Sequence, residues 1–274
     1  METKQDFIDL WKAVGWNNAE DYHKYIVSDE KLRPDLNEKI IDFLNPDKIN
    51  VKEFWKATDE VFGTDTVCNS DLTLGKTHNI EASNFFNHLI PQFLGLYGNL
   101  ECAILNASRK FKNISIAEIG CGYGSFEHWF VQPNRNRIDK YTGFDIIPRR
   151  EDFVEIGNPD GSFSDEQLKE YNGVFNIFYS CNVFQHLSES QIRKYFKQVN
   201  EMLPIGGYFL MTYVYDVPYT YHYGQKVDII PYEDFIELTK EMGFGACFVN
   251  LQKCSNNSQL KPFSVTLEKI SNIS

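Results

Sequence analysis

The fold is decided by the stretch Ile116-Ala-Glu-Ile-Gly-Cys-Gly-Tyr-Gly-Ser125, followed by Tyr141-Thr-Gly-Phe-Asp145. The first part has the pattern of a short buried strand that breaks into a glycine-rich turn, and a helix is expected to begin after that turn. Glycines let the backbone adopt conformations barred to other residues and approach a ligand closely. Asp145 closes a second strand with a carboxylate. An acid at this place in a βαβ unit suits a bidentate grip on two ribose hydroxyls.

The spacing of Gly120, Gly122 and Gly124 narrows the class of ligand. A dinucleotide fingerprint has the pattern G-x-G-x-x-G around a pyrophosphate, whereas this chain has G-x-G-x-G. Glu118 adds a negative charge at the end of the strand, where it would repel a pyrophosphate. A ligand with a ribose and a cationic group but no phosphate is therefore favoured. S-adenosylmethionine (SAM) is such a ligand.

At these positions the chain resembles the class I SAM-dependent methyltransferases. Their first motif, an acid followed by x-G-x-G-x-G, is matched by Glu118 and the three glycines, and their ribose-binding acid is matched by Asp145. Cys121 and Ile146 are expected to border the same cofactor, and Tyr123 in the glycine turn either covers it or merely packs. The resemblance covers roughly residues 79–270. A glycine triplet alone could also serve purely as a tight connecting turn. The acid and the downstream strands argue against that alternative.

From residue 114 onward the hydrophobic pattern alternates between strand and helix, which predicts parallel βαβ units. The predicted fold class is α/β, a mostly parallel, seven-stranded, doubly wound sheet of the SAM methyltransferase type. We expect strands at 114–119, 140–145, 153–156, 174–180 and 207–214, and a final hairpin of 245–252 and 262–269. Helices are expected at 79–89, 91–108, 188–203 and 231–242, the third of them opened by a capping box at Ser188 and Gln191.

The first 75 residues have the pattern of short helices and match no family that we can name. Thr3 is expected to cap the first helix, Pro34 suits the first turn of a second, and a third is predicted over Val51–Phe62, ended by Gly63. We therefore predict a helical extension over residues 1–75 and a SAM-binding domain over 76–274. The extension either packs on the core or caps the substrate pocket, and the two roles are compatible.

The segment Phe175–Leu187 resembles the family's fourth-strand motif, in which a strand ends beside the sulfonium. This resemblance implies that the methionine part of SAM is bordered by Ser180, Cys181 and Asn182. The usual acid near the start of the motif is Asn176 here, which weakens a catalytic interpretation of that position. Two side chains in the turn 157–162 are candidates for the adenine amino group, although a simple turn explains them nearly as well; they are Asn158 and Asp160.

Two histidines are candidates for a general base. Methyl transfer from a sulfonium is a direct displacement, so a base is needed only if the nucleophile must lose a proton. His222 lies in the tyrosine-rich segment 213–225, which we expect to form a wall of the acceptor pocket; the alternative is a strand end whose tyrosines cover the core. His186 falls at the edge of the fourth strand, where bonding to the backbone is the alternative. We rank His222 first.

The composition narrows the partners and the compartment. A net charge of −11 and a pI near 5.1 argue against a nucleic-acid partner, which needs a basic face, and against an anionic membrane surface. Six scattered cysteines without a C-x-x-C pair suit a reduced, cytoplasmic protein. No signal peptide, transmembrane run or metal site is predicted.

The sequence therefore predicts a SAM-dependent methyltransferase that acts on a small polar acceptor and releases S-adenosylhomocysteine. Methylation of oxygen is favoured over nitrogen, because the motif of many amino-methyltransferases, Asn/Asp-Pro-Pro-aromatic, is missing. The acceptor we expect is a sugar, a nucleotide-linked sugar or a related surface-polysaccharide precursor. The alternatives are an N-methyltransferase of a small amine or protein side chain, and a non-catalytic SAM-binding sensor or partner. The oligomeric state is not indicated.

Overall fold

The computed structural model describes residues 3–18, 20–22, 44–45, 47–62, 90–124, 126–215, 219–222, 225–251 and 261–273. Several predictions lie outside these described residues: the helix that begins at Pro34, the helix over 79–89, the glycine stop at Gly63 and the boundary near residue 75. Among the helices of the described residues, none combines the length and apolar character that a membrane span requires.

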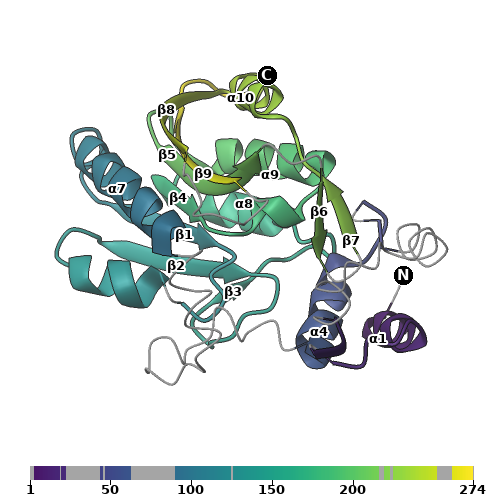
Figure 1. Cartoon of the computed structure of the whole chain (residues 1–274). Helices are drawn as coiled ribbons and strands as arrows, with labels where there is room; N and C mark the ends of the chain where they lie inside the picture. Colours follow the sequence, from purple (N-terminus) through teal and green to yellow (C-terminus); the bar gives the residue numbers. More distant parts are fainter. Residues whose placement is uncertain are drawn as a thin grey trace.

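A seven-stranded sheet forms the centre of the molecule (Figure 1), in the order β3-β2-β1-β4-β5-β9-β8. The strands from β3 to β5 are parallel, and β9 runs antiparallel to both of its neighbours. The predicted fold class is thereby confirmed. The bounds are β1 (Ser115–Ile119), β2 (Lys140–Asp145), β3 (Val154–Glu155), β4 (Ile177–Ser180), β5 (Tyr208–Tyr215), β8 (Phe244–Leu251) and β9 (Lys261–Lys269).

Helices cover both faces of this sheet (Figure 1), which explains why β1 and β4 are almost entirely buried. On one face, α7 (Ile90–Ala107) packs with the π-helical turn η3 (Glu127–Val131), where the sequence led us to expect an ordinary helix. The other face carries α8 (Asp165–Tyr171), α9 (Glu189–Met202) and α10 (Tyr232–Glu241). The predicted capping box of α9 is present, with the Ser188 hydroxyl accepting from the Gln191 N–H.

The strand β4 begins later than the predicted residue 174 because Asn176 is used as a connector. Its side-chain oxygen accepts from the Ser115 N–H at 3.1 Å, and its amide donates to the Asn113 carbonyl at 2.7 Å. These bonds tie the entry of β4 to the entry of β1. The amide at the place of the family's acid therefore has a structural role in this chain.

The N-terminal helices form a cluster with a core of its own. The helix α1 (Lys4–Ala13) is capped by Thr3 as predicted, and α4 (Val51–Phe62) has the predicted bounds. Phe7, Trp11 and Phe54 are fully buried between them. In Figure 1 these helices lie beside the hairpin of β6 (Tyr219–His222) and β7 (Gln225–Asp228), beyond one end of the sheet. The same cluster includes Ile146 from the end of β2, so the helices contact the sheet there.

The tyrosine-rich segment differs from the loop that we expected. Most of its described part forms an antiparallel hairpin of β6 (Tyr219–His222) and β7 (Gln225–Asp228). Tyr213 lies in β5 and is fully buried. Its ring stacks on Phe235 with centroids 4.8 Å apart, and its hydroxyl accepts from the Ile230 N–H at 3.1 Å. For Tyr213 the alternative therefore holds: it is a core residue and not part of a pocket wall.

Candidate cofactor and acceptor site

The glycine turn follows β1 and folds back over the end of β2. The N–H groups of Gly120 and Cys121 both donate to the Phe144 carbonyl, at 2.8 and 3.1 Å, and the Gly124 N–H donates to the Cys121 carbonyl at 2.8 Å. Gly120, Gly122 and Gly124 have φ values of 73°, 51° and 83°. This left-handed region is costly for residues with a Cβ, which explains why the sequence places glycine at all three positions.

The three glycines differ in what surrounds them. A Cβ on Gly120 would lie 2.2 Å from the Val183 Cγ2, and a Cβ on Gly124 would lie 2.8 Å from the Phe153 ring. A Cβ on Gly122 would meet no described atom within 4 Å. Close packing therefore excludes a side chain at Gly120 and Gly124, whereas Gly122 faces open space in which a ligand can approach the backbone.

The structure brings the carboxylate of Asp145 to this middle glycine. Its Oδ2 accepts from the Gly122 N–H at 2.8 Å, and its Oδ1 accepts from the Ile147 N–H at 3.0 Å. Burial raises the pKa of Asp145, although these two bonds oppose the rise. Each carboxylate oxygen has a second lone pair, so a carboxylate fixed in this way retains acceptor capacity for ribose hydroxyls. The open space and this acceptor fit the ribose part of SAM.

The end of β4 lies against the glycine turn. The Ser180 hydroxyl donates to the Ile119 carbonyl at 3.0 Å. Asn182 has φ 59°, which is uncommon for a residue other than glycine, and its N–H donates to the Thr212 hydroxyl at 2.7 Å. Such strained residues cluster at functional sites. Cys181 is half-buried and Cys121 is buried, and burial raises the pKa of the Cys121 thiol.

The two adenine candidates are held by their own turn. The Asn158 amide donates to the Ser162 hydroxyl at 3.0 Å and to the Phe163 carbonyl at 2.8 Å. The Asp160 carboxylate accepts from Ser162 and forms an ion pair with Lys194 at 2.5 Å. These contacts fit the alternative of a simple turn, and an adenine contact by either residue stays a prediction.

Two further cofactor candidates are Glu118, just before the turn, and Tyr123, within it. Glu118 is buried in β1 and accepts a hydrogen bond from the Tyr141 hydroxyl. Burial raises the pKa of Glu118 well above its usual range, and the bond from Tyr141 only partly offsets this. Tyr123 is half-buried in the turn, and the Arg149 guanidinium lies 5.8 Å from its ring centre. Sequence reasoning missed Tyr141, whose role depends on the pairing of β1 with β2.

His186 is the last residue of the short helix η5 (Phe184–His186), which follows β4. Its ring makes an edge contact with Trp55 of α4, with centroids 5.3 Å apart. Burial lowers the pKa of His186 to about 4, so its imidazole is neutral at pH 7, and a hydrogen bond with the Asn182 backbone partly opposes this shift. That backbone bond fits the alternative of a structural histidine. His222 is the last residue of β6, a strand that lies against η5. Its side chain lies outside the described part of the structure.

The N-terminal cluster crosses the edge of the sheet near this histidine. The Lys52 N–H donates to the Pro159 carbonyl at 3.2 Å, and its ammonium pairs with Glu155 at 2.8 Å. Asp59 pairs with Arg149 at 2.7 Å. Together with the contact between Trp55 and His186, these bonds join α4 to the ends of β2, β3 and β4. Such a position suits a cap, although sequence reasoning could not select the partners of α4.

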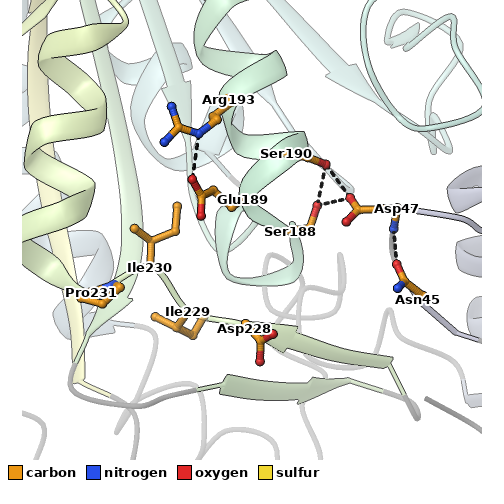
Figure 2. Close-up of a pocket in the computed structure, with 10 residues that line it drawn as sticks. All are labelled: Asn45, Asp47, Ser188, Glu189, Ser190, Arg193, Asp228, Ile229, Ile230 and Pro231. Atoms are coloured by element: carbon orange, nitrogen blue, oxygen red, sulfur yellow. Dashed lines mark hydrogen bonds and ion pairs between the residues drawn. The ribbon is translucent and has the colours of Figure 1, made fainter. Parts of the chain in front are cut away.

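Next to the cap lies a cavity of about 610 Å³ (Figure 2). Asp47 stands on one wall and accepts from the hydroxyls of Ser188 and Ser190, which begin α9. Arg193 forms ion pairs with Glu189 and Glu241. The lining residues are Asn45, Asp47, Ser188, Glu189, Ser190, Arg193, Asp228, Ile229, Ile230 and Pro231. Its lining combines polar and apolar side chains, and it carries more carboxylates than cationic groups. Within the described residues, no cluster of His, Cys, Asp and Glu has the form of a metal site.

The open, mostly parallel sheet, with a glycine turn after β1 and an acid at the end of β2, defines the class I methyltransferase fold. A family model described as a methyltransferase domain matches residues 99–245, more than half of the chain. The chain belongs to this family: it is a SAM-dependent methyltransferase, and SAM is its cofactor.

The chain is also similar, at low identity, to solved structures of methyltransferases. A 1,6-didemethyltoxoflavin-N1-methyltransferase from Burkholderia thailandensis is 14% identical, with a TM-score of 0.49 over 75% of this chain and 88% of that one. A putative SAM-dependent methyltransferase from Listeria monocytogenes is 13% identical, with a TM-score of 0.45 over 65% and 99%. A SAM-dependent methyltransferase from Archaeoglobus fulgidus is 11% identical, with a TM-score of 0.46 over 70% and 100%. A search of curated proteins found no match.

Proposed function

We propose that this enzyme transfers the methyl group of SAM to a hydroxyl group of a small polar acceptor. The candidate acceptors are a sugar, a nucleotide-linked sugar or a related surface-polysaccharide precursor. The observation that carries the proposal is the position and charge state of His186. It lies four residues beyond Asn182, beneath Trp55 of the cap, and its lowered pKa keeps the imidazole neutral at pH 7. A neutral imidazole can receive a hydroxyl proton at that pH, and the lowered pKa makes this one a weaker base than an ordinary histidine.

In this proposal the cofactor is held by the glycine turn and the two neighbouring strand ends. Asp145 accepts from the ribose hydroxyls, and Gly122 leaves room for their approach. The backbone at Ser180, Cys181 and Asn182 borders the methionine part. Bound SAM supplies a methyl group on a sulfonium, a leaving group that needs no further activation. The protein's task is therefore to align the acceptor and to remove one proton.

The cap supports a small acceptor. The helix α4 contacts the ends of β2, β3 and β4, and therefore covers much of the edge at which a ligand must enter. A large, rigid partner such as duplex DNA would have to displace these contacts. The net charge of −11 also opposes a polyanion. We propose that residues 1–75 act as the acceptor cap and that residues 76–274 form the SAM-binding domain.

The proton step assigns a role to one of two histidines. The acceptor hydroxyl donates to the imidazole of His186 and passes its proton during or just after attack on the methyl group. General-base catalysis of this kind is worth roughly 10²–10⁴-fold in rate. His222 on the neighbouring strand β6 is the second candidate. On the described contacts we rank His186 first, which reverses the order suggested by the sequence.

One observation favours a second candidate function, N-methylation of a small amine. The cavity beside the cap is lined by Asp47, Glu189 and Asp228, with Arg193 as the cationic side chain among the lining residues. An excess of carboxylates attracts a protonated amine and repels a phosphate. A nucleotide-linked sugar is thereby the least favoured member of the proposed acceptor class.

The test is turnover of radiolabelled SAM with matched acceptors. The panel pairs a neutral hexose with its amino sugar and its nucleotide-linked form, together with a simple alkylamine, and the site of methylation is read by mass spectrometry. Methylation at oxygen supports the proposal, and methylation at nitrogen supports the second function. Failure of every member, with SAM binding intact, would reject this acceptor class. Gel shifts with duplex DNA and structured RNA at low salt should show no complex in the micromolar range.

A further inference from the structure

A buried carboxylate opens the helical turn that follows the three glycines. Glu127 is the first residue of η3, and it is 5% exposed. Its Oε2 accepts from the Arg150 guanidinium at 2.7 Å, and its Oε1 accepts from the Arg135 guanidinium at 3.1 Å. Removing one partner of a buried ion pair leaves behind a charge that is costly to bury. Both arginines therefore stabilise the helical turn that begins at Glu127.

The two arginines reach Glu127 from different parts of the chain. Arg135 belongs to the same connection and comes directly after the short helix η4 (Gln132–Asn134). Arg150 belongs to the loop after β2, where it follows Asp145 by five residues. The bond between Arg150 and Glu127 thus joins the segment after the glycines to the loop that begins at Asp145. These two segments carry the glycines and the acid of the proposed ribose site.

The Arg150 side chain also packs closely against the glycine turn. Its guanidinium lies 4.3 Å from the centre of the Phe153 ring, which is a cation–π distance, and the Asp152 carboxylate accepts from its Nε at 2.9 Å. A Cβ on Gly124 would lie 2.8 Å from the Arg150 Nη1 and 2.8 Å from the Phe153 ring. The third glycine therefore leaves the space that the stacked pair of Arg150 and Phe153 fills. Arg150 also acts electrostatically on the Cys121 thiol inside the turn.

The spacing of the two segments decides whether a ribose can bind between them. The Gly122 N–H donates to the Asp145 carboxylate at 2.8 Å, and in the proposed site the same carboxylate also accepts from the ribose hydroxyls. Hydrogen bonds of this kind tolerate a variation of only about 0.5 Å in the distance from donor to acceptor. Arg150 holds the segments together through the Glu127 carboxylate and the Phe153 ring, so the capacity of Asp145 stays available to the ligand.

We propose that Arg150 is a positioning residue for the cofactor. By pairing with Glu127 and stacking on Phe153, it holds the glycine turn and Asp145 at the spacing that the ribose requires before SAM binds. A preformed site binds more tightly, because less ordering is left to the binding step. The proposal rests on the ribose site of the proposed function, and it assigns Arg150 no contact with the reacting atoms.

The experiment measures the affinity for S-adenosylhomocysteine by calorimetry and the melting temperature without ligand. S-adenosylhomocysteine lacks the sulfonium charge, so the loss of a nearby cation does not by itself change its attraction to the site. We expect Arg150→Met to bind it about 10-fold more weakly, because the variant must order the turn on binding. Arg150→Lys keeps the charge but loses the planar surface that stacks on Phe153, and it should recover part of the affinity.

Arg135→Met is the matched control, because it removes the other cation from the same carboxylate. Both variants leave Glu127 with a single arginine, so both should lower the melting temperature, by about 2–4 °C. The control should bind S-adenosylhomocysteine within about twofold of the wild type, since the bond of Arg135 to Glu127 stays within one connection of the chain. An equal loss of affinity in the two variants would overturn the proposal, because the cause would then be the charge of Glu127 and not the bridge made by Arg150.

A double variant separates positioning from stability. In Glu127→Gln/Arg150→Met no carboxylate is left with a missing partner, so the melting temperature should return to within about 2 °C of the wild type. The affinity for S-adenosylhomocysteine should stay about 10-fold weaker. Recovery of the wild-type affinity here, or wild-type affinity in Arg150→Met, would overturn the positioning role. The double variant carries the test alone if Arg150→Met does not fold.

Asp145→Ala distinguishes a failure of this proposal from a failure of the proposed ribose site. Wild-type affinity in Asp145→Ala would reject the ribose site, and the positioning role with it. A weakened Asp145→Ala beside an unaffected Arg150→Met would reject only the positioning role.

Discussion

The proposed cofactor half of the site and its proposed acceptor half are built in different ways. The cofactor half comes from one continuous run of chain, the three strands β1, β2 and β4 with their connecting turns, and main-chain hydrogen bonds fix the glycine turn. The acceptor half is assembled from three distant segments: α4, the stretch from η5 into α9, and the hairpin of β6 and β7. Side-chain contacts join those segments.

This difference has a consequence for stability and for specificity. Main-chain bonds at the end of a buried sheet leave little freedom, so we expect the cofactor half to be the more rigid region. The contacts of the cap include ion pairs at the surface, each worth about 1 kcal/mol or less. An enzyme built in this way can change its acceptor by altering the cap while the SAM half stays as it is.

The largest expected effect comes from the glycine turn. Gly120→Ala combines a φ of 73° with a Cβ placed 2.2 Å from Val183. Backbone strain and overpacking together should cost about 2–4 kcal/mol in the free energy of unfolding. Urea denaturation measures this loss. Gly122→Ala is the control: it has no clash with a described atom, so it should cost only the strain, yet it should still weaken SAM binding. Equal stability losses in the two variants would show that packing does not distinguish the glycines.

Next in size is the loss of the proposed base. His186→Ala should lower kcat by roughly 10²-fold or more and leave the affinity for S-adenosylhomocysteine nearly unchanged. His222→Ala should have the smaller effect. In the wild type, burial keeps the imidazole neutral, so kcat/KM should hold as the pH falls below 6.5 and should drop through the folded pKa of about 4. If kcat/KM of the wild type instead fell near pH 6.5, or if both variants were fully active, another group would have to accept the proton.

Asp145→Ala tests the cofactor half by itself. Loss of a charged hydrogen-bond partner costs roughly 1.5–3 kcal/mol, which corresponds to about 10- to 150-fold in affinity. Calorimetry with S-adenosylhomocysteine measures it, and the affinity for the acceptor should change little. Wild-type affinity in this variant would remove Asp145 from the ribose site, and tight binding of NAD would contradict the cofactor assignment.

The smallest effect is expected at the cap. Asp59→Asn removes the ion pair with Arg149, which joins α4 to the segment after β2. The unfolding free energy should fall by about 1 kcal/mol or less, and the affinity for S-adenosylhomocysteine should change by less than about twofold. The KM for the acceptor should rise if the cap forms the acceptor wall. An unchanged acceptor KM would count against that role.

Local signals account for what could be predicted. The bounds of α4 and the start of α9 follow from hydrophobic periodicity and from the Ser188 capping box, both of which act within a few residues. A similar local box, Ser164 with Gln167, opens α8 and was within reach of the same reasoning. The hairpin of β6 and β7 was missed because its tyrosines suit a loop, a strand or a core equally well.

The sequence by itself determined the sheet, the glycine turn and the identity of the cofactor, because short buried hydrophobic runs, φ-permissive glycines and the acid that closes the second strand are properties of short segments. Only the tertiary structure decided that Tyr213 belongs to the core, that Arg150 pairs with Glu127, and that Trp55 covers His186. Each of these depends on which residues are brought together from distant parts of the chain. Strand register and packing fix such pairings, and no local pattern encodes them.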